Sequence, residues 1–69
     1  MPLMIAPLNK PLRIVKILAD DKTKKHLESL GITINSNIEL ISNSSSIVLK
    51  VKEGRLAIDR ELASKIVVA

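Results

Sequence analysis

The only histidine of the chain, His26, is the first side chain to weigh as a metal ligand. Asp20, Asp21 and Glu28 lie within a few positions of it, and imidazole and carboxylate groups together suit divalent transition metals. One histidine with mobile carboxylates nevertheless makes a poor site, and the chain has no cysteine to supply a thiolate. We therefore predict that His26 is an exposed helix residue and that the chain has no metal site and no cofactor. If a metal does bind, His26 is the candidate ligand.

The residue types also argue against covalent catalysis. A lone histidine has no cysteine to activate, and the serines lie outside any Gly-x-Ser-x-Gly context. The only glycines are Gly31 and Gly54, so the sequence contains no glycine-rich phosphate loop. We therefore expect a protein that is not an enzyme.

Three lysines, Lys22, Lys24 and Lys25, stand in the first turns of a predicted helix. Cations at a helix N-terminus oppose the helix dipole, at a cost of about 0.3–1 kcal/mol each. Helix stability alone would favour acids there, so the lysines suggest a docking face for an acidic partner. The formal net charge of +4 favours the same kind of partner. The alternative is an ordinary solvated basic face.

The helix that carries these lysines is predicted at about residues 21–30. One of the two aspartates at its start can cap it by accepting from free backbone N–H groups. Gly31 stands at its end, where a left-handed backbone costs glycine no steric clash. Ile32 would then contact Leu27 in a Schellman ending, in which the chain reverses and the next residue locks onto the helix.

The remaining chain alternates as short strands separated by turn residues. Asn35 tolerates a left-handed backbone, which predicts a turn near residues 34–37, and Gly54 predicts a tight turn with Glu53. A serine-rich loop is expected at residues 42–46, and a helical turn at about residues 59–64. In the first strand, Arg13 and Lys16 fall on opposite faces of a regular alternation, which predicts a bulge or a bend between them. The expected strands are 12–18, 37–41, 47–52, 55–58 and 65–69.

Five strands at this spacing suit a small barrel or a strongly bent sheet, so the predicted class is mainly β, with one short helix. Residues 1–69 make one domain, whose core must be aliphatic because the chain has no aromatic residue. The apolar runs are much shorter than the roughly 20 residues that a membrane span needs. Without cysteine or a signal peptide, the chain is expected in the cytoplasm.

The stretch HLESLGITINSNIELI resembles the FeoA family, small cytoplasmic proteins associated with bacterial ferrous-iron uptake. The stretch GRLAIDRELASKIVV is similar to the closing strand, helical turn and final strand of that family. Three features depart from the family pattern: a Pro-Gly turn is replaced by Ile34-Asn35, the serine-rich loop is short, and a glycine near Lys10 is missing. The matching positions of the first stretch are Leu27, Leu30, Gly31, Ile32, Ile38 and Leu40.

This resemblance implies an SH3-like barrel and a role beside FeoB, the membrane ferrous-iron transporter with a GTP-binding domain. It implies recruitment of a cytoplasmic protein to the inner face of the membrane, and an association with transition metals. Two alternatives stay open: a basic barrel that binds nucleic acid, and an SH3-like regulatory module of the kind found in iron-dependent repressors. Nucleic-acid binding is disfavoured because the chain lacks aromatic residues on which bases could stack.

Overall fold

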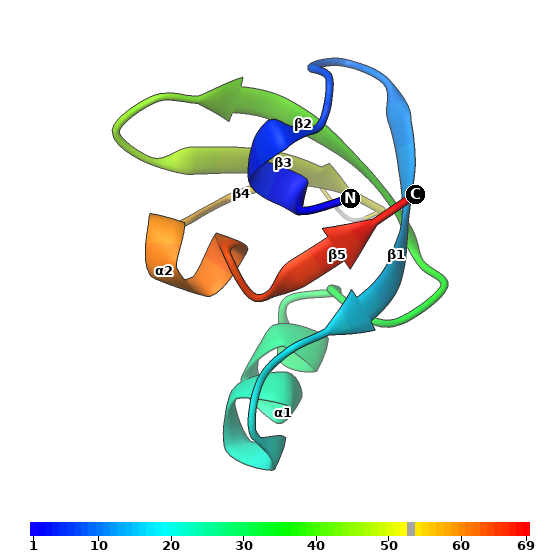
Figure 1. Cartoon of the computed structure of the whole chain (residues 1–69), viewed down its shortest axis with the longest axis vertical. Coiled ribbons are helices and arrows are strands. Elements are labelled where there is room, and N and C mark those ends of the chain that lie inside the picture. Colours follow the sequence, from blue (N-terminus) through cyan, green and yellow to red (C-terminus); the bar gives the residue numbers. More distant parts are fainter. Residues whose placement is uncertain (53) are drawn as a thin grey trace.

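The fold is one antiparallel five-stranded sheet with a short 3-10 helix and two helices (Figure 1). The computed structural model describes residues 1–52 and 54–69. The elements in chain order are η1 (Leu3–Ile5), β1 (Pro11–Ile17), α1 (Asp21–Ser29), β2 (Asn37–Asn43), β3 (Ile47–Val51), β4 (Gly54–Ile58), α2 (Arg60–Ala63) and β5 (Ile66–Val68).

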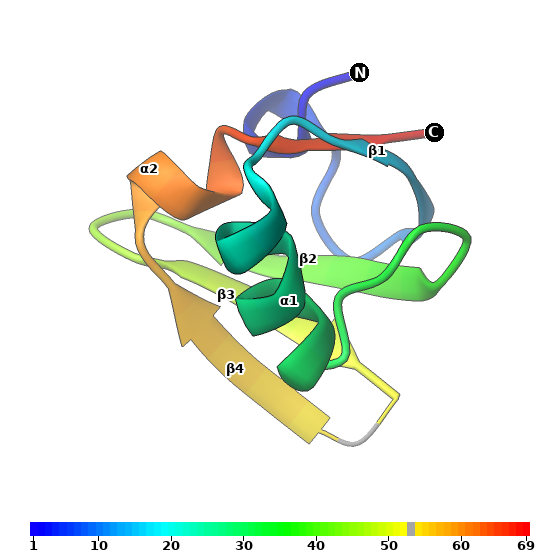
Figure 2. The same cartoon turned by 90° about the horizontal axis from the view of Figure 1, so that it is seen from below.

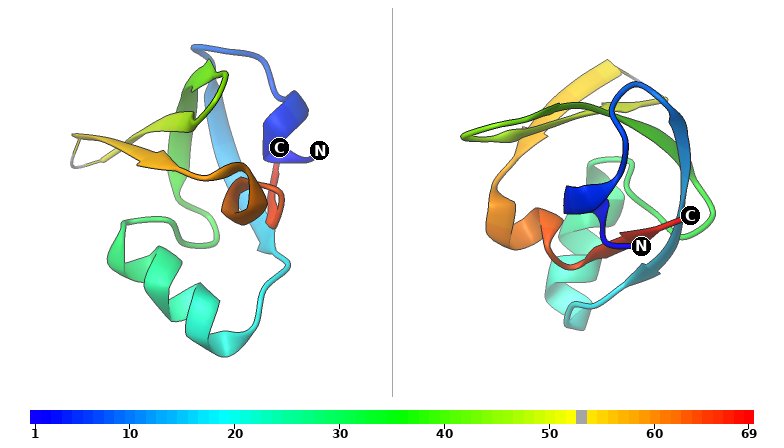
Figure 3. Two further views of the ribbon diagram at one scale, coloured as in Figure 1. Left: turned by 90° about the vertical axis from the view of Figure 1, so that its left-hand side faces the viewer. Right: turned by 45° about the horizontal axis from the view of Figure 1, so that its top comes forward.

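The strand order is β4-β3-β2-β1-β5, and β1 joins the two halves of the sheet. Its first residues pair with β2 and its last residues pair with β5, with a register shift between Ile14 and Lys16. This shift confirms the predicted irregularity, which lets one strand turn from one partner to the other. The sheet curls as a result, as the two views of Figure 3 show.

The predicted SH3-like, mainly β fold is confirmed, but the curled sheet does not close into a full barrel. Among the described residues, β4 pairs only with β3, so β4 and β5 form the two edges. The outer side of β5 is covered by the N-terminal segment, because Pro2 bridges to Val67 and Val68 donates to the carbonyl of Met1. Within residues 1–52 and 54–69, no segment covers the edge of β4 in this way.

The core is entirely aliphatic, as the composition requires. In β3, Ile47, Leu49 and Val51 point inward, which confirms the alternation read from the sequence. Each large side chain of this kind contributes about 1.5–3 kcal/mol when fully buried. The side chains with no exposed surface that fill most of the core are Leu3, Ile14, Leu27, Ile32, Leu40, Ile47, Leu49, Ile66 and Val68.

α1 ends in the predicted Schellman motif. Gly31 has φ +88°, and its N–H donates to the carbonyl of Glu28 over 3.0 Å. The N–H of Ile32 donates to the carbonyl of Leu27 over 2.9 Å. The ending therefore satisfies two free carbonyls of the helix and delivers Leu27 and Ile32 together into the core.

The turn before β2 also follows its prediction. Asn35 has φ 72°, in the left-handed region that asparagine tolerates. Its N–H donates to the carbonyl of Ile14 over 2.7 Å, while the hydroxyl of Ser36 donates to the carbonyl of Thr33 over 2.6 Å. These bonds hold the connection from α1 against β1, so that β2 begins at Asn37.

The serine-rich loop predicted at residues 42–46 is wrong in its extent. β2 continues through Ser42 and Asn43, which pair with Val48 and Ile47 after a register shift. Only residues 44–46 connect the two strands. Polar residues can continue a strand when a neighbouring strand supplies the hydrogen bonds, and β3 supplies them here.

The two predictions after β3 have different outcomes. The turn at Glu53-Gly54 includes residue 53, which lies outside the described residues; Gly54 itself begins β4, pairs with Val51 and has φ +138°. The helical turn is confirmed as α2. The carboxylate of Asp59 caps it by accepting from the N–H of Leu62 over 2.7 Å.

Candidate partner-binding site

The three lysines lie on α1. This short helix stands below the sheet in Figure 1 and in front of it in the view from below of Figure 2. Lys22 and Lys25 are exposed, while Lys24 is half-buried. Lys22 and Lys25 are three positions apart, so they lie on one face of the helix. The structure therefore brings these two charges together as an accessible basic surface in the N-terminal half of α1.

Asp20 is the acid that allows this helix to begin with cations. Its carboxylate accepts a hydrogen bond of 2.8 Å from the backbone N–H of Thr23. Hydrogen bonding by the side chain and the backbone of Thr23 lowers the pKa of Asp20, and the positive charge of Lys65 lowers it further. The negative cap thus satisfies a free N–H and offsets part of the repulsion between the helix dipole and the lysines.

His26 belongs to no cluster of three or more possible metal ligands among the described residues. It is exposed, and across residues 1–52 and 54–69 no three histidine or carboxylate side chains gather into a possible metal site. The hydroxyl of Ser29 donates a hydrogen bond to the backbone carbonyl of His26.

The three turn residues, Gly31, Asn35 and Gly54, have structural roles and are not gathered into a site with the lysines. Gly31 ends the same helix that the lysines begin, and Asn35 directs the chain into β2. Gly54 starts the edge strand. Each has a positive φ, which is the property for which the sequence singled it out.

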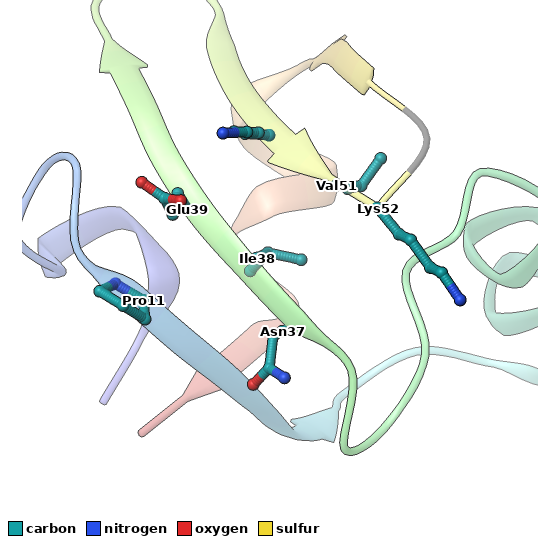
Figure 4. Close-up of a pocket in the computed structure, with 7 residues that line it drawn as sticks. Pro11, Asn37, Ile38, Glu39, Val51 and Lys52 are labelled. Carbon is teal, nitrogen blue, oxygen red and sulfur yellow. The ribbon is translucent and has the colours of Figure 1, made fainter.

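Two hollows lie beside the end of β3 and were not expected from the sequence. One, of about 280 Å³, separates the C-terminal end of α1 from β3, with Glu28, Thr33 and Lys52 in its wall. The other, of about 210 Å³, is an open groove on the outer face of the sheet. Figure 4 shows Pro11, Glu39 and Lys52 around this groove. The alternation of side chains along each strand could have placed these residues on one face of the sheet. That they are neighbours depends on the register of β1 with β2 and of β2 with β3, which the sequence does not give.

A polar network that sequence reasoning missed joins η1, the β2–β3 hairpin and α2. The amide of Asn43 donates to the carbonyl of Met4 over 2.7 Å. The guanidinium of Arg60 donates to the side-chain oxygen of Asn43 over 3.1 Å and to the carbonyl of Ser44 over 2.8 Å. The network fixes the short hairpin loop against α2, and this gives it a structural role.

Among the helices of the described residues, none combines the length and the apolar character needed to cross a bilayer.

Comparison with known proteins gives the fold a family. A family model for the FeoA domain matches residues 1–69. A crystal structure of an iron uptake regulatory protein (FeoA) is similar over 99% of this chain and 92% of the other, with a TM-score of 0.88 and 26% identity. The NMR structure of a FeoA-like protein from Clostridium acetobutylicum is similar over 100% of this chain and 84% of the other, with a TM-score of 0.84 and 17% identity.

The same fold occurs inside a larger protein. A manganese-dependent transcriptional repressor in complex with manganese is similar over 100% of this chain but only 35% of the other, with a TM-score of 0.87 and 18% identity. No curated protein sequence matched the chain. The repressor likeness shows a shared fold, whereas the family model spans every residue of this sequence. The chain therefore belongs to the FeoA domain family, a family of small accessory domains in iron transport.

Proposed function

We propose that this domain is a non-catalytic accessory protein of ferrous-iron uptake that binds a FeoB-like membrane transporter at its cytoplasmic side. It acts in the cytoplasm, is recruited to the inner face of the membrane through that transporter, and modulates the nucleotide-driven gating of the transporter. The observation that carries the contact is the exposed pair Lys22 and Lys25 on one face of α1, with Lys22 in the first turn, where the helix dipole disfavours a cation.

Energetics support a binding role for this pair. Asp20 already satisfies one free backbone N–H at the start of α1, and the core anchors the end of the helix through Leu27. The exposed lysines therefore add no packing that the helix needs, and the interaction of Lys22 with the dipole is unfavourable. An acidic surface on a partner would attract Lys22 and Lys25. This charge complementarity would accelerate association and fix the orientation of the two proteins.

The experiment compares the parent with the double variant Lys22→Glu and Lys25→Glu for binding to the purified transporter in lipid nanodiscs. We expect slower association for the double variant and a weaker salt dependence of the association rate, because rim charges act mostly on encounter. A matched control, Lys10→Glu with Lys16→Glu, changes the net charge by the same amount through exposed side chains outside α1. It should associate at close to the parent rate.

Two results would contradict the proposal. If the α1 variant and the control slow association equally, net charge acts and the helix is not the contact. If the parent binds generic duplex DNA with a steep loss of affinity as salt rises, and does not bind the transporter, a nucleic-acid-binding module is the better description.

A further inference from the structure

The exposed face of the sheet carries a row of four side chains in direct register. Pro11 pairs with Glu39, Glu39 pairs with Lys50, and Lys50 pairs with Arg55. The row therefore runs across β1, β2, β3 and β4 and ends with two cations at the edge of the sheet. Lys52 stands at the end of β3 on the rim of the groove that Figure 4 shows, and it adds a further positive charge.

The pair formed by Lys50 and Arg55 is not explained by stability. Like charges directly opposite each other on neighbouring strands destabilise a sheet. Glu39 on the other side of Lys50 offsets part of that charge, but Lys50 is the only cross-strand neighbour that Arg55 has in the part of the chain that the structure describes. A negative charge on a strand added beside β4 would extend the row and give Arg55 a neighbour of opposite charge.

The position one strand beyond β4 is open. β4 lies at the outer margin of the sheet in Figure 2, and among the described residues it pairs only with β3. Every second residue of such an edge strand turns its N–H and C=O away from its neighbour, ready to accept another strand. At the other edge of the sheet, by contrast, the N-terminal segment covers β5.

The inner face of β4 also leaves apolar surface for a partner. On this face Ile58 is buried, but Leu56 is only partly buried against the core. On the outer face, Ala57 is exposed. A strand added beside β4 would thus place alternate side chains next to Arg55 on one face and next to Leu56 on the other.

We propose that the free edge of β4 binds an extended acidic segment of a partner protein, in which acidic residues alternate with apolar residues. The backbone of β4 provides the hydrogen bonds, Arg55 selects the acidic positions with the positive charge of Lys50 one strand behind it, and Leu56 selects the apolar ones. This site is separate from α1 and does not rest on the proposed function.

A second copy of this chain fits the edge less well. Antiparallel pairing of two β4 strands would place the basic outer faces of both copies side by side, with Lys50 and Arg55 contributed by each. Charged edge residues of this kind normally keep sheets from joining edge to edge. Arg55 therefore discourages self-association by the same charge that attracts an acidic strand.

The test uses a labelled peptide of alternating glutamate and valine as the probe. Controls are a peptide of the same length and composition with its glutamates and valines in blocks, and an alternating lysine–valine peptide. We expect the alternating acidic peptide to bind and to slow amide hydrogen exchange in β4 above all other elements. Both control peptides should bind at least about tenfold more weakly, because one lacks the alternation and the other lacks the charge.

Matched protein variants identify the residue responsible. Arg55→Glu should weaken binding of the alternating acidic peptide by about tenfold, the effect typical of losing one close charge pair and gaining a repulsion. Lys16→Glu, an equal change of charge at an exposed position of β1, should leave peptide affinity within about twofold of the parent.

Several outcomes would overturn the inference. Equal binding of the blocked peptide, unchanged affinity in Arg55→Glu, or exchange protection on an element other than β4 would each remove the strand-addition site. Concentration-dependent protection of β4 without peptide, together with dimers in analytical ultracentrifugation, would make a second copy its occupant. Transporter binding through α1 is measured separately, so either proposal can fail alone.

Discussion

Leu27 and Ile32 enter the core as a pair at the end of α1. The backbone N–H of Ile32 donates to the carbonyl of Leu27 over 2.9 Å, and both side chains have no exposed surface. The reversal between them depends on Gly31, so one backbone conformation attaches the projecting helix to the sheet.

Gly31→Ala should therefore destabilise the domain by about 1–2 kcal/mol. The cost comes from the backbone, because Gly31 has φ +88° and an added Cβ would meet Val51 only at an ordinary 3.9 Å. Urea denaturation at neutral pH measures the change in the free energy of unfolding. Gly31→Asn is the control and should lose less, since asparagine tolerates a left-handed backbone. A Gly31→Ala protein as stable as the parent would disprove the argument.

Local signals explain why this part of the fold could be predicted from the sequence. The cap at Asp20, the stop at Gly31 and the turn at Asn35 each depend on residues within a few positions of one another. The end of β2 could not be predicted in this way, because Ser42 and Asn43 become strand residues only through their pairing with β3.

The candidate sites divide along the same line. Helix periodicity was sufficient to place Lys22 and Lys25 on one face of α1. The neighbouring positions of Lys50 and Arg55 depend on the register between β3 and β4, and the row reaches Glu39 only through the register of β2. How far the sheet closes depends on how strongly β1 bends between β2 and β5. The sequence indicates the bulge in β1 but not the size of the bend.

Asp20 should make helix stability depend on pH in acid. Because its folded-state pKa lies below the ordinary value of 3.8, the charged cap contributes stability that is fully present above pH 3.8. That contribution is lost as the pH falls through the lowered pKa. Asp20→Asn keeps a capping oxygen but does not titrate, so the parent's stability relative to this variant should fall as the solution becomes more acidic. Thermal melts of both proteins between neutral and strongly acidic pH measure the difference, and parallel curves would contradict the assignment.

The isolated domain should not bind a divalent transition metal tightly. His26 is exposed, and the described residues bring no cluster of carboxylates to it. Anaerobic calorimetric titration with Fe²⁺, and with Mn²⁺ as a substitute, should show no saturable site with a dissociation constant below about 10 μM, the weak end of calcium-sensor sites. A one-to-one isotherm that disappears in His26→Ala would show that the imidazole does bind metal.

The double variant Lys22→Glu with Lys25→Glu should melt at the parent temperature or slightly above it. Lys22→Glu places an acid in the first turn of α1, where it interacts favourably with the helix dipole by about 0.3–1 kcal/mol before screening by salt, whereas Lys25 lies in the second turn, beyond most of that effect. Differential scanning calorimetry at low salt checks this expectation. Marked destabilisation would mean that the lysines support the fold, and slower transporter association in this variant could then not be assigned to a lost contact.

Arg55→Glu should stabilise the domain while it weakens binding of the alternating acidic peptide. In the parent, Arg55 stands directly opposite Lys50, and replacing this repulsion by an attraction should add roughly 0.2–1 kcal/mol to the free energy of unfolding. Arg55→Gln removes the repulsion without adding an attraction, so its stability should fall between the two. Urea denaturation at low and high salt measures the series, and the differences should shrink as salt screens the charges. If the parent is instead the most stable of the three, the two cations are not in conflict, and stability alone would explain why the edge strand carries an arginine.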